Sequence, residues 1–354
     1  MVISFDGIVI HGVAGAVPLN ASALEDGSGT KAEKEIAKKF ARKGGVTSRF
    51  VSGPNQTSAD LCYAAAKALI EGKGIDTNEI GVVVMVTQTA DYRSPATAAM
   101  LQYRLGLSES CIAFDVDLGC SGFTCGMGIA GSILSNSDCR YALLLCGETP
   151  AREKDPRYTR LTSNADKMLF GDAGTATLLE KCERDAAHMR VSSMTRGAGY
   201  KNIINPYGFY RHPAYPSDDA AENVMDGMEV FNFATTDATK MILDYLRDMG
   251  SRPEDYDCLV LHQANKFIME RIVKLTGFSP EQSLVSIDRF GNTSSASIPV
   301  SLVDRYGKSG ENRELRVLAC GYGVGLSWSC EEFRVNEADI LPLVQTDEYF
   351  EDGF

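Results

Sequence analysis

The stretch CIAFDVDLGCSGFTCGMGIAGSIL, residues 111–134, joins an apolar, strand-like run to a helix-like run that is rich in small residues. Four glycines lie in the helical run, at positions 122, 126, 128 and 131, although each glycine costs a helix interior about 1 kcal/mol relative to alanine. Such a composition is expected where neighbouring backbones approach the helix closely. Residues 122–134 therefore predict a buried central helix that follows directly on a strand.

Cys120 stands at the junction of the two runs. A thiol at the N-terminus of a helix feels the positive end of the helix macrodipole, which lowers its pKa and favours the thiolate. Cys120 is therefore a candidate nucleophile. The alternative is that Cys120 is a buried small residue, since the chain has ten cysteines and most of them must be inert.

Similar apolar runs and helix-like stretches alternate along the rest of the chain, which is typical of an α/β fold with buried sheets. We expect strands at 8–12, 82–87, 112–116, 141–146, 175–179, 258–262, 284–287, 315–320 and 326–330. We expect helices at 59–71, 96–105, 122–134, 230–249 and 266–276.

The order of these runs is also doubled. GVVVMVTQT at 81–89 has a counterpart in CLVLHQAN at 258–265, and RYALLLCGE at 140–148 has one in LRVLACGYG at 315–323. This indicates two similar halves, 1–183 and 184–335, followed by an acidic extension at 336–354. The proline- and tyrosine-containing segment 197–223 is predicted to be a long surface loop or covering flap.

Composition excludes several classes of protein. The 354 residues carry a formal net charge of -12, whereas proteins that bind nucleic acid or anionic membranes usually have a basic excess. No signal peptide and no apolar stretch of ~20 residues is present, so we expect a cytoplasmic protein with reduced cysteines and no membrane association. Because CxxC and HExxH motifs are absent, we expect no metal and no bound cofactor.

Two polar residues in the second half are further candidates. His262 ends an apolar strand in the string HQAN, and sites in α/β folds collect at the carboxyl ends of parallel strands. Asn292 lies in FGNTSSAS, before a run of small residues. Taken alone, His262 is also consistent with a structural hydrogen-bonding residue and Asn292 with a helix cap or turn.

Together these strings resemble the landmarks of one family, β-ketoacyl-acyl carrier protein synthase III, in the family's order. They are GGVTSRF at 44–50, CSGF at 120–123, FGDAGTA at 170–176, DGMEVFNFA at 226–234, HQAN at 262–265, GNTSSASIP at 291–299 and GYGVGLSW at 321–328. The resemblance covers roughly residues 3–335. It implies a thiolase-like fold of two duplicated halves in a five-layered αβαβα arrangement, and a homodimer.

The resemblance also implies a reaction and its residues. An acyl thioester of CoA or of acyl carrier protein would acylate Cys120, and malonyl-acyl carrier protein would then lose carbon dioxide and attack the acyl group. His262 and Asn292 would stabilise the enolate as neutral donors, without a metal. The backbone N–H groups of Cys120 and Val324 would form the oxyanion hole, although family members have Gly or Ala where this chain has Val324.

The expected entrance departs from the family's pattern. The segment KKFARKGG lacks the tryptophan that stacks on CoA in many members, and Phe267 takes a place that is often arginine. Ser94 stands where a partner-subunit phenylalanine often closes the acyl pocket, which suggests a longer, bulkier or polar acyl group. We expect the pocket and its gate to involve Ser94, Tyr322 and Phe209, and the carrier or CoA entrance to involve Lys43, Arg160 and Lys266.

Three alternatives remain beside this condensing enzyme. A relative can use the same cysteine to move an acyl group onto an alcohol or amine without decarboxylation. An inactive partner subunit is disfavoured because all three residues are retained. Hydroxymethylglutaryl-CoA synthase shares the fold but requires a catalytic glutamate, for which Glu148 is not a convincing substitute.

Overall fold

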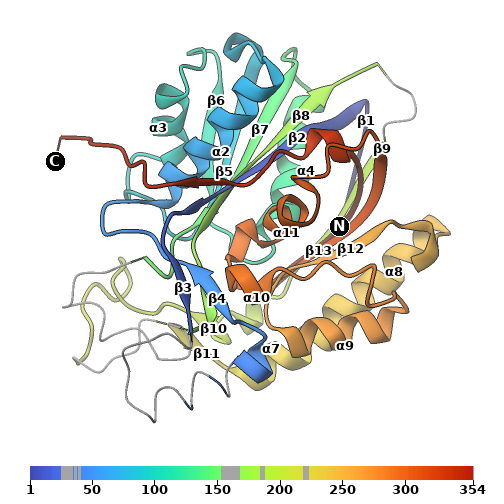
Figure 1. Cartoon of the computed structure of the whole chain (residues 1–354). Coiled ribbons are helices and arrows are strands. Elements are labelled where there is room, and N and C mark those ends of the chain that lie inside the picture. The colour runs from blue at the N-terminus through green and yellow to red at the C-terminus, as the bar shows by residue number, and fades with distance from the viewer. Residues whose placement is uncertain are drawn as a thin grey trace.

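Two stacked β-sheets form the centre of the protein, with helices between them and on both outer faces (Figure 1). The computed structural model of the chain describes residues 1–24, 35, 38, 41–152, 168–183, 188–217 and 223–353. In these residues the first sheet has the strand order β15-β2-β8-β7-β5-β6, and the second has the order β1-β9-β14-β13-β12. The short pairs β3–β4 and β10–β11 lie outside both sheets.

The elements have the following bounds. The strands are β1 Val2–Asp6, β2 Ile8–Pro18, β3 Ala21–Ala23, β4 Ser48–Phe50, β5 Ile80–Val86, β6 Ile112–Val116, β7 Tyr141–Glu148, β8 Ala173–Lys181, β9 His188–Thr195, β10 Ile203–Ile204, β11 Val224–Met225, β12 Cys258–Leu261, β13 Glu314–Gly323, β14 Ser327–Asn336 and β15 Val344–Thr346. The helices are α2 Ser58–Lys73, α3 Thr97–Arg104, α4 Gly122–Ser135, α7 Gly227–Phe233, α8 Thr239–Met249, α9 Lys266–Thr276, α10 Ile287–Phe290 and α11 Ser297–Tyr306.

The two sheets repeat one topology, as the doubled sequence predicts. In the first, β2, β8, β7, β5 and β6 lie side by side, with parallel pairs β5–β6 and β5–β7 and antiparallel pairs β7–β8 and β8–β2. In the second, β9, β14, β13 and β12 follow the same order and the same directions. The fold is the expected α/β, thiolase-like arrangement of two duplicated halves.

The strand predicted at 284–287 is wrong. At this position, where the second half would have its counterpart of β6, the structure has only an isolated parallel bridge between Leu259 and Ser283. The backbone N–H groups of Ser286 and Ile287 donate to the side-chain oxygen of Gln263, at 3.0 and 3.2 Å. The chain therefore leaves the sheet and turns into α10 instead of extending the strand.

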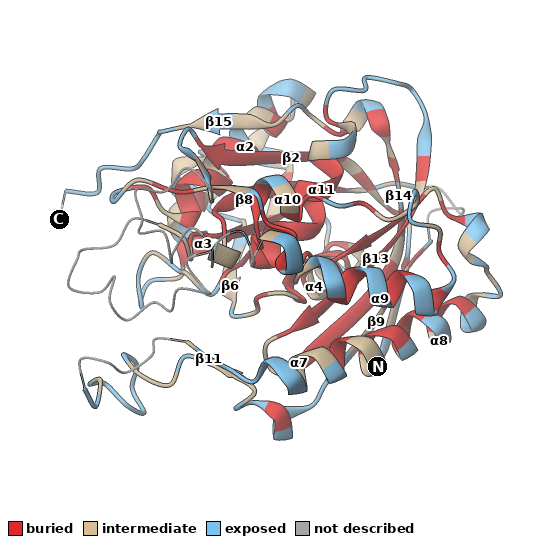
Figure 2. Ribbon diagram, turned by 60° about the horizontal axis from the view of Figure 1, so that its bottom comes forward, coloured by how far each residue is buried: buried red, intermediate tan, exposed pale blue. Residues whose placement is uncertain are grey.

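The helices form three layers around the two sheets. Helices α2 and α3 pack on the outer face of the first sheet, α4 and α11 lie between the sheets, and α8 packs with α9 on the outer side of the second sheet. Figure 2 shows that the strands of both sheets and the helices between them are largely buried. The helix predicted at 230–249 is interrupted by a π-helical turn at Ala234–Ala238.

Close neighbours explain the glycines of α4, but these neighbours are side chains and not backbones. A Cβ atom would lie 2.4 Å from Val86 at Gly122, 2.7 Å from Leu144 at Gly126 and 2.2 Å from the ring of Phe5 at Gly131. At Gly128 the nearest atom is at an ordinary 3.4 Å. Three of the four glycines therefore allow this helix to fit between the two sheets.

Each end of the chain pairs with the sheet of the other half. Strand β1 pairs with β9 in the second sheet, and β15 of the acidic extension pairs in parallel with β2 in the first. The side chain of Gln56 donates to the carbonyls of Thr346 and Glu348, at 3.0 and 3.1 Å, and so holds the extension along the first half. The boundaries at 183 and 335 remain sequence predictions, because the sheets themselves are not contiguous in sequence.

Among the described residues, no helix is long and apolar enough to cross a membrane, and no cluster of three or more His, Cys, Asp or Glu side chains is arranged to hold a metal ion. The described part of the predicted flap at 197–223 is mostly irregular, with the short strand β10 and one turn of 3₁₀ helix at Gly197–Gly199.

Candidate active site

Cys120 lies in the turn between β6 and α4, two residues before the helix begins. The turn fits against the end of β13 because position 323 is a glycine. A Cβ atom there would lie 2.5 Å from the Cβ and 2.8 Å from the Sγ of Cys120. Gly321 is similarly required, since its Cβ would lie 2.8 Å from the Cα of Ser121. The glycines at 321 and 323 therefore leave room for the turn that carries the Cys120 thiol.

Two backbone N–H groups are directed at the Cys120 sulfur, those of Cys120 itself and of Val324. The turn that carries Val324 is held by Ser327, whose hydroxyl donates to the Val324 carbonyl at 2.6 Å. Ser121 in turn bonds to Ser327, with 2.6 Å between the two hydroxyl oxygens. A valine side chain at 324 therefore leaves the backbone donor of this position in place.

His262 follows β12 and is almost completely buried, with 1% of its surface exposed. Its Nδ1 lies 2.8 Å from the hydroxyl of Ser297 on α11. The ring of Tyr322 packs edge-on against the imidazole, at 5.6 Å between centroids, and its hydroxyl donates to the His262 carbonyl. Burial lowers the pKa of His262 to about 3, so the imidazole is neutral at physiological pH and can offer one N–H as a donor.

Asn292 is fixed by the loop that contains the FGDAGTA string. Its backbone N–H donates to Leu169 at 2.8 Å, and its carbonyl accepts from Gly171 at 3.1 Å. Its side-chain oxygen accepts from the backbone N–H of Ser294 at 2.9 Å. Because the oxygen is used in this way, the NH₂ group of the amide is the end that remains for a substrate.

Glycines allow the loop around Gly171 and the loop around Asn292 to pair closely. A Cβ atom at Gly171 would lie 2.0 Å from the Phe290 carbonyl oxygen, and Gly291 has a φ of 67°. Arg49 of the GGVTSRF string donates to the carbonyl of Phe170 at 3.0 Å. The glycines and the arginine of these strings therefore serve to position Asn292.

Ser294 connects the three predicted residues. Its backbone contacts both Asn292 and His262, and its side chain lies within hydrogen-bonding reach of the Cys120 sulfur. It is the only non-glycine residue in the described part of the chain with a positive φ, at 49°. Its hydroxyl also donates to the carboxyl of Glu148, 3.4 Å away. Ser294 could not be found from the sequence, because a serine in a run of small residues carries no sign of this conformation.

The thiol is less acidic than its place before a helix suggests. Burial raises the pKa of Cys120 to about 11, and the negative charge of Glu148 adds to this, while the Val324 N–H and the Ser294 hydroxyl oppose it. Although Cys120 as a residue keeps partial exposure, the atoms around its sulfur remove most of the water. The helix macrodipole does not outweigh this desolvation, so the resting group is a thiol and not the expected thiolate.

Comparison with known proteins identifies the family. The family models for the 3-oxoacyl-[acyl-carrier-protein] synthase III domain and for its C-terminal domain match residues 114–197 and 246–335. A β-ketoacyl-[acyl-carrier-protein] synthase III of Rhodopirellula baltica is 30% identical over 93% of this chain and 98% of the relative. The chain belongs to the β-ketoacyl-acyl carrier protein synthase III family of condensing enzymes.

Another synthase III, from Desulfitobacterium hafniense, is 32% identical over 80% of this chain and 85% of its own length. Among solved structures, a 3-oxoacyl-(acyl-carrier protein) synthase from Burkholderia xenovorans superposes with a TM-score of 0.87 at 29% identity, and covers 98% of this chain and 99% of its own. The likeness therefore extends over both halves and is not limited to the motifs.

Two of the three residues predicted for the entrance lie on the surface. Lys43 and Lys266 are both exposed, and the two segments touch, since a Cβ atom at Gly45 would lie 2.6 Å from Lys266. Phe267 is exposed and its ring stacks on that of Phe231. Arg160, like most of the basic run at 31–43, lies outside the described residues.

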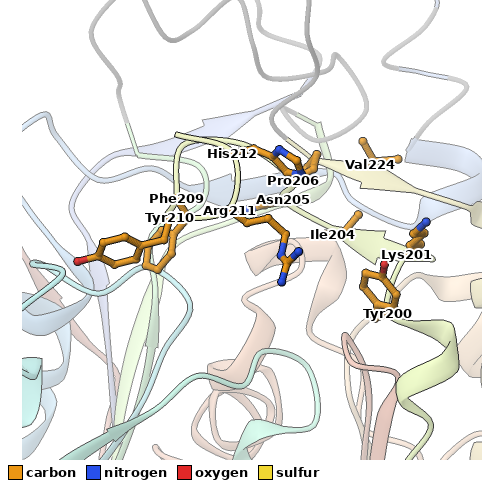
Figure 3. A pocket seen from close by; sticks show the side chains of 10 residues that line it. All are labelled: Tyr200, Lys201, Ile204, Asn205, Pro206, Phe209, Tyr210, Arg211, His212 and Val224. Carbon is orange, nitrogen blue, oxygen red and sulfur yellow. The ribbon is translucent and has the colours of Figure 1, made fainter. Parts of the chain in front are cut away.

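Phe209 lines a cavity of about 1060 Å³ in the flap (Figure 3). The aromatic rings of Tyr200 and Tyr210 and the basic side chains of Lys201 and Arg211 also line it. Of the other two gate predictions, Ser94 is exposed in the loop before α3, whereas Tyr322 is buried against His262. The structure therefore does not bring Ser94, Tyr322 and Phe209 into one described cavity.

Proposed function

We propose that this protein is a condensing enzyme. An acyl thioester acylates Cys120, and a decarboxylative Claisen condensation with malonyl-acyl carrier protein then gives a 3-oxoacyl thioester. One observation carries the proposal: a thiol with two backbone donors at its sulfur shares one network with a neutral histidine and a fixed asparagine amide. The backbone donors are suited to the oxyanion of the acylation step, and the histidine and the asparagine are suited to the enolate of the decarboxylation step.

In the acylation step, Cys120 Sγ attacks the thioester carbonyl and negative charge develops on its oxygen. The N–H groups of Cys120 and Val324 are the donors for that oxyanion, and such a donor contributes about 3 kcal/mol of transition-state stabilisation. A thiol serves this step because it is a good nucleophile and also leaves readily when the acyl group is passed on.

In the decarboxylation step, the malonyl thioester loses carbon dioxide and becomes an enolate. The Asn292 NH₂ group and an N–H of the neutral His262 are the donors for its oxygen. The required tautomer has the proton on Nε2, and in it Nδ1 accepts from the Ser297 hydroxyl, which lies 2.8 Å away. The proposed reaction therefore needs no metal or organic cofactor, only the two thioester substrates.

We infer the substrates and the assembly from the same family membership. The acyl donor is a CoA or carrier-protein thioester, and the basic and aromatic residues around Lys43, Lys266 and the Phe209 cavity are suited to the anionic groups of either. The exposed loop with Ser94 is suited to reach the acyl pocket of a second subunit, and the protein is proposed to act as a homodimer with acyltransferase chemistry.

Intact-mass measurements test the nucleophile. The protein is incubated with a panel of acyl-CoA and acyl-carrier thioesters, and one acyl mass is expected on the wild type but not on Cys120→Ala. Cys125→Ala is the matched control, because this second thiol lies on α4 beside the Ser193 hydroxyl of β9, and it should acylate like the wild type. Equal acylation of Cys120→Ala would show that the assignment is wrong.

Carbon dioxide release tests the condensation. Release from malonyl-acyl carrier protein is expected for the wild type and is expected to fall in Asn292→Ala by about 10²-fold or more, as for the loss of a positioned donor. Asn136→Ala, at the exposed end of α4, is the matched amide control. Robust acylation with no carbon dioxide release would instead support acyl transfer to an alcohol or amine.

A further inference from the structure

Glu148 is a buried acid next to the reacting thiol that the proposed mechanism does not use. It ends β7, and 1% of its surface is exposed. Its donors are neutral: the Gln88 N–H at 3.1 and 3.2 Å, the Thr89 hydroxyl at 2.9 Å and the Ser294 hydroxyl at 3.4 Å. The carboxyl therefore lies in a polar pocket that would accept either a proton or a negative charge.

Ser294 forms a direct path from this carboxyl to the Cys120 sulfur. A Cβ atom at Gly119, the residue before Cys120, would lie 3.0 Å from the Ser294 hydroxyl, so the hydroxyl lies against the nucleophile turn. Its positive φ of 49° is an unfavourable conformation for a residue with a Cβ atom. Such an outlier persists only where surrounding contacts hold it, and it commonly marks a functional position.

We propose that Glu148 takes up the Cys120 thiol proton through the Ser294 hydroxyl during acylation. The proposal rests on the acylation of Cys120 proposed above. Ser294 accepts the proton from Sγ and passes its own to the Glu148 carboxylate, while Sγ forms its bond to the thioester carbon. The bond from that carbon to the leaving sulfur then breaks, and the leaving thiolate takes a proton back along the same path or from solvent.

The acidity of the groups gives this route a pH dependence. Burial raises the pKa of Glu148 to about 8 and that of Cys120 to about 11. The carboxylate that can accept a proton is therefore present mainly above pH 8. The thiolate formed by the transfer is a minor species of about one part in a thousand, which attack on a bound thioester would consume.

Among the described residues, three thiols interact with the charge of Glu148. Besides Cys120, they are Cys62 on α2 and Cys146 on the same strand, both buried with a raised pKa. Neither is expected to ionise near pH 8. A step in the acylation rate in that range would therefore belong to Glu148.

Two effects of Glu148 have opposite signs, and this makes the proposal testable. A proton acceptor speeds acylation, whereas a negative charge that only repels the thiolate slows it. Replacing the carboxyl by Glu148→Gln therefore decides between them. Ser294→Gly removes the hydroxyl and also suits the positive φ, so it interrupts the path without straining the backbone.

The experiment measures single-turnover acylation of Cys120 and its alkylation by iodoacetamide, both by intact mass, from pH 6 to pH 10. The wild-type rates are expected to rise through about pH 8. Because a thiol with a pKa of about 11 also ionises directly at higher pH, the rates are compared near pH 7, where Glu148→Gln and Ser294→Gly should each be about 10²-fold slower. Both variants should lack the step near pH 8, and the double variant should be no slower than either. Glu331→Gln, a buried acid on β14 that does not contact Cys120, should keep the wild-type profile.

Faster or unchanged reaction in Glu148→Gln would overturn the proposal, and so would losses that multiply in the double variant. Glu148→Asp retains a carboxylate and should keep a pH step, which separates proton transfer from a merely structural role. If no thioester acylates the wild type, the proposed function fails, but the iodoacetamide profiles still report on the proton path.

Discussion

Gly323→Ala is the most direct test of the site's geometry. The added Cβ atom would lie 2.5 Å from the Cβ and 2.8 Å from the Sγ of Cys120, whereas such atoms need about 3.5 Å or more. The Cys120 side chain must therefore move by roughly 1 Å, and a misplacement of ~1 Å at a reacting atom can cost ~10²-fold in rate. We expect acylation to slow by about 10²-fold and the free energy of unfolding to fall by about 1–3 kcal/mol.

Single-turnover acylation by intact mass, together with urea unfolding, checks this prediction. Gly128→Ala is the matched control, because it adds the same methyl group to α4 at an ordinary distance of 3.4 Å from Val191; it should acylate at the wild-type rate. If Gly323→Ala folds and acylates within about threefold of the wild type, the sulfur does not react from the position described, since a misplaced sulfur is expected to cost far more.

Three other predictions test the surroundings. Ser297→Ala removes the partner of His262 Nδ1 and should slow carbon dioxide release about tenfold, the equivalent of one hydrogen bond, with acylation nearly unchanged. Because the His262 pKa of about 3 lies below its ordinary 6.5, stability should be lost as the pH falls from 6.5 towards 3. We expect the free energy of unfolding, measured by urea titration, to fall between pH 7 and pH 5 by about 2 kcal/mol less in His262→Gln than in the wild type. Arg104→Ala breaks a buried pair with Asp60, with 4% and 2% of the side chains exposed, and should lower the free energy of unfolding by about 3–5 kcal/mol. Arg140→Ala at a surface pair should leave the free energy of unfolding nearly unchanged.

The strands and helices were predictable because the apolar runs are long and carry clear periodicity. The small residues at 122–134 and the doubled order of apolar runs also predict a buried helix and two similar halves, and the topology confirms both. The strand at 284–287 was mispredicted for a tertiary reason: the side chain of Gln263, more than twenty residues away, captures the backbone N–H groups that a strand would use. No local pattern in the sequence contains that contact.

Within the candidate site, the sequence indicates the residues whose side chains could react but not the residues that contact and position them. Cys120, His262 and Asn292 each lie in a recognisable sequence string. In the structure, Ser294 contacts all three. The proposed roles of Ser294 and Glu148 depend on a positive φ and on the approach of β7 to the loop before α11. The acidity of the thiol was also misjudged, because a helix N-terminus is visible in the sequence whereas desolvation by the packed turn is not.

The repeated topology explains why the site requires both halves. In the first half, Gln88 and Cys120 lie in the turns that follow β5 and β6, and Glu148 is the last residue of β7. In the second half, the equivalent turns follow β12, the bridge at residue 283 and β13, and they carry His262, Asn292 and Val324.

Each half supplies its set from the carboxyl ends of its parallel strands, which is where α/β folds place polar groups. The two sets have opposite chemical characters. The first holds the nucleophile and the acid that bonds to the Gln88 N–H, whereas the second offers neutral donors. The Cys120 sulfur is met by the backbone N–H of Val324 from the other half as well as by the N–H of Cys120 itself, so the proposed site needs groups from both halves.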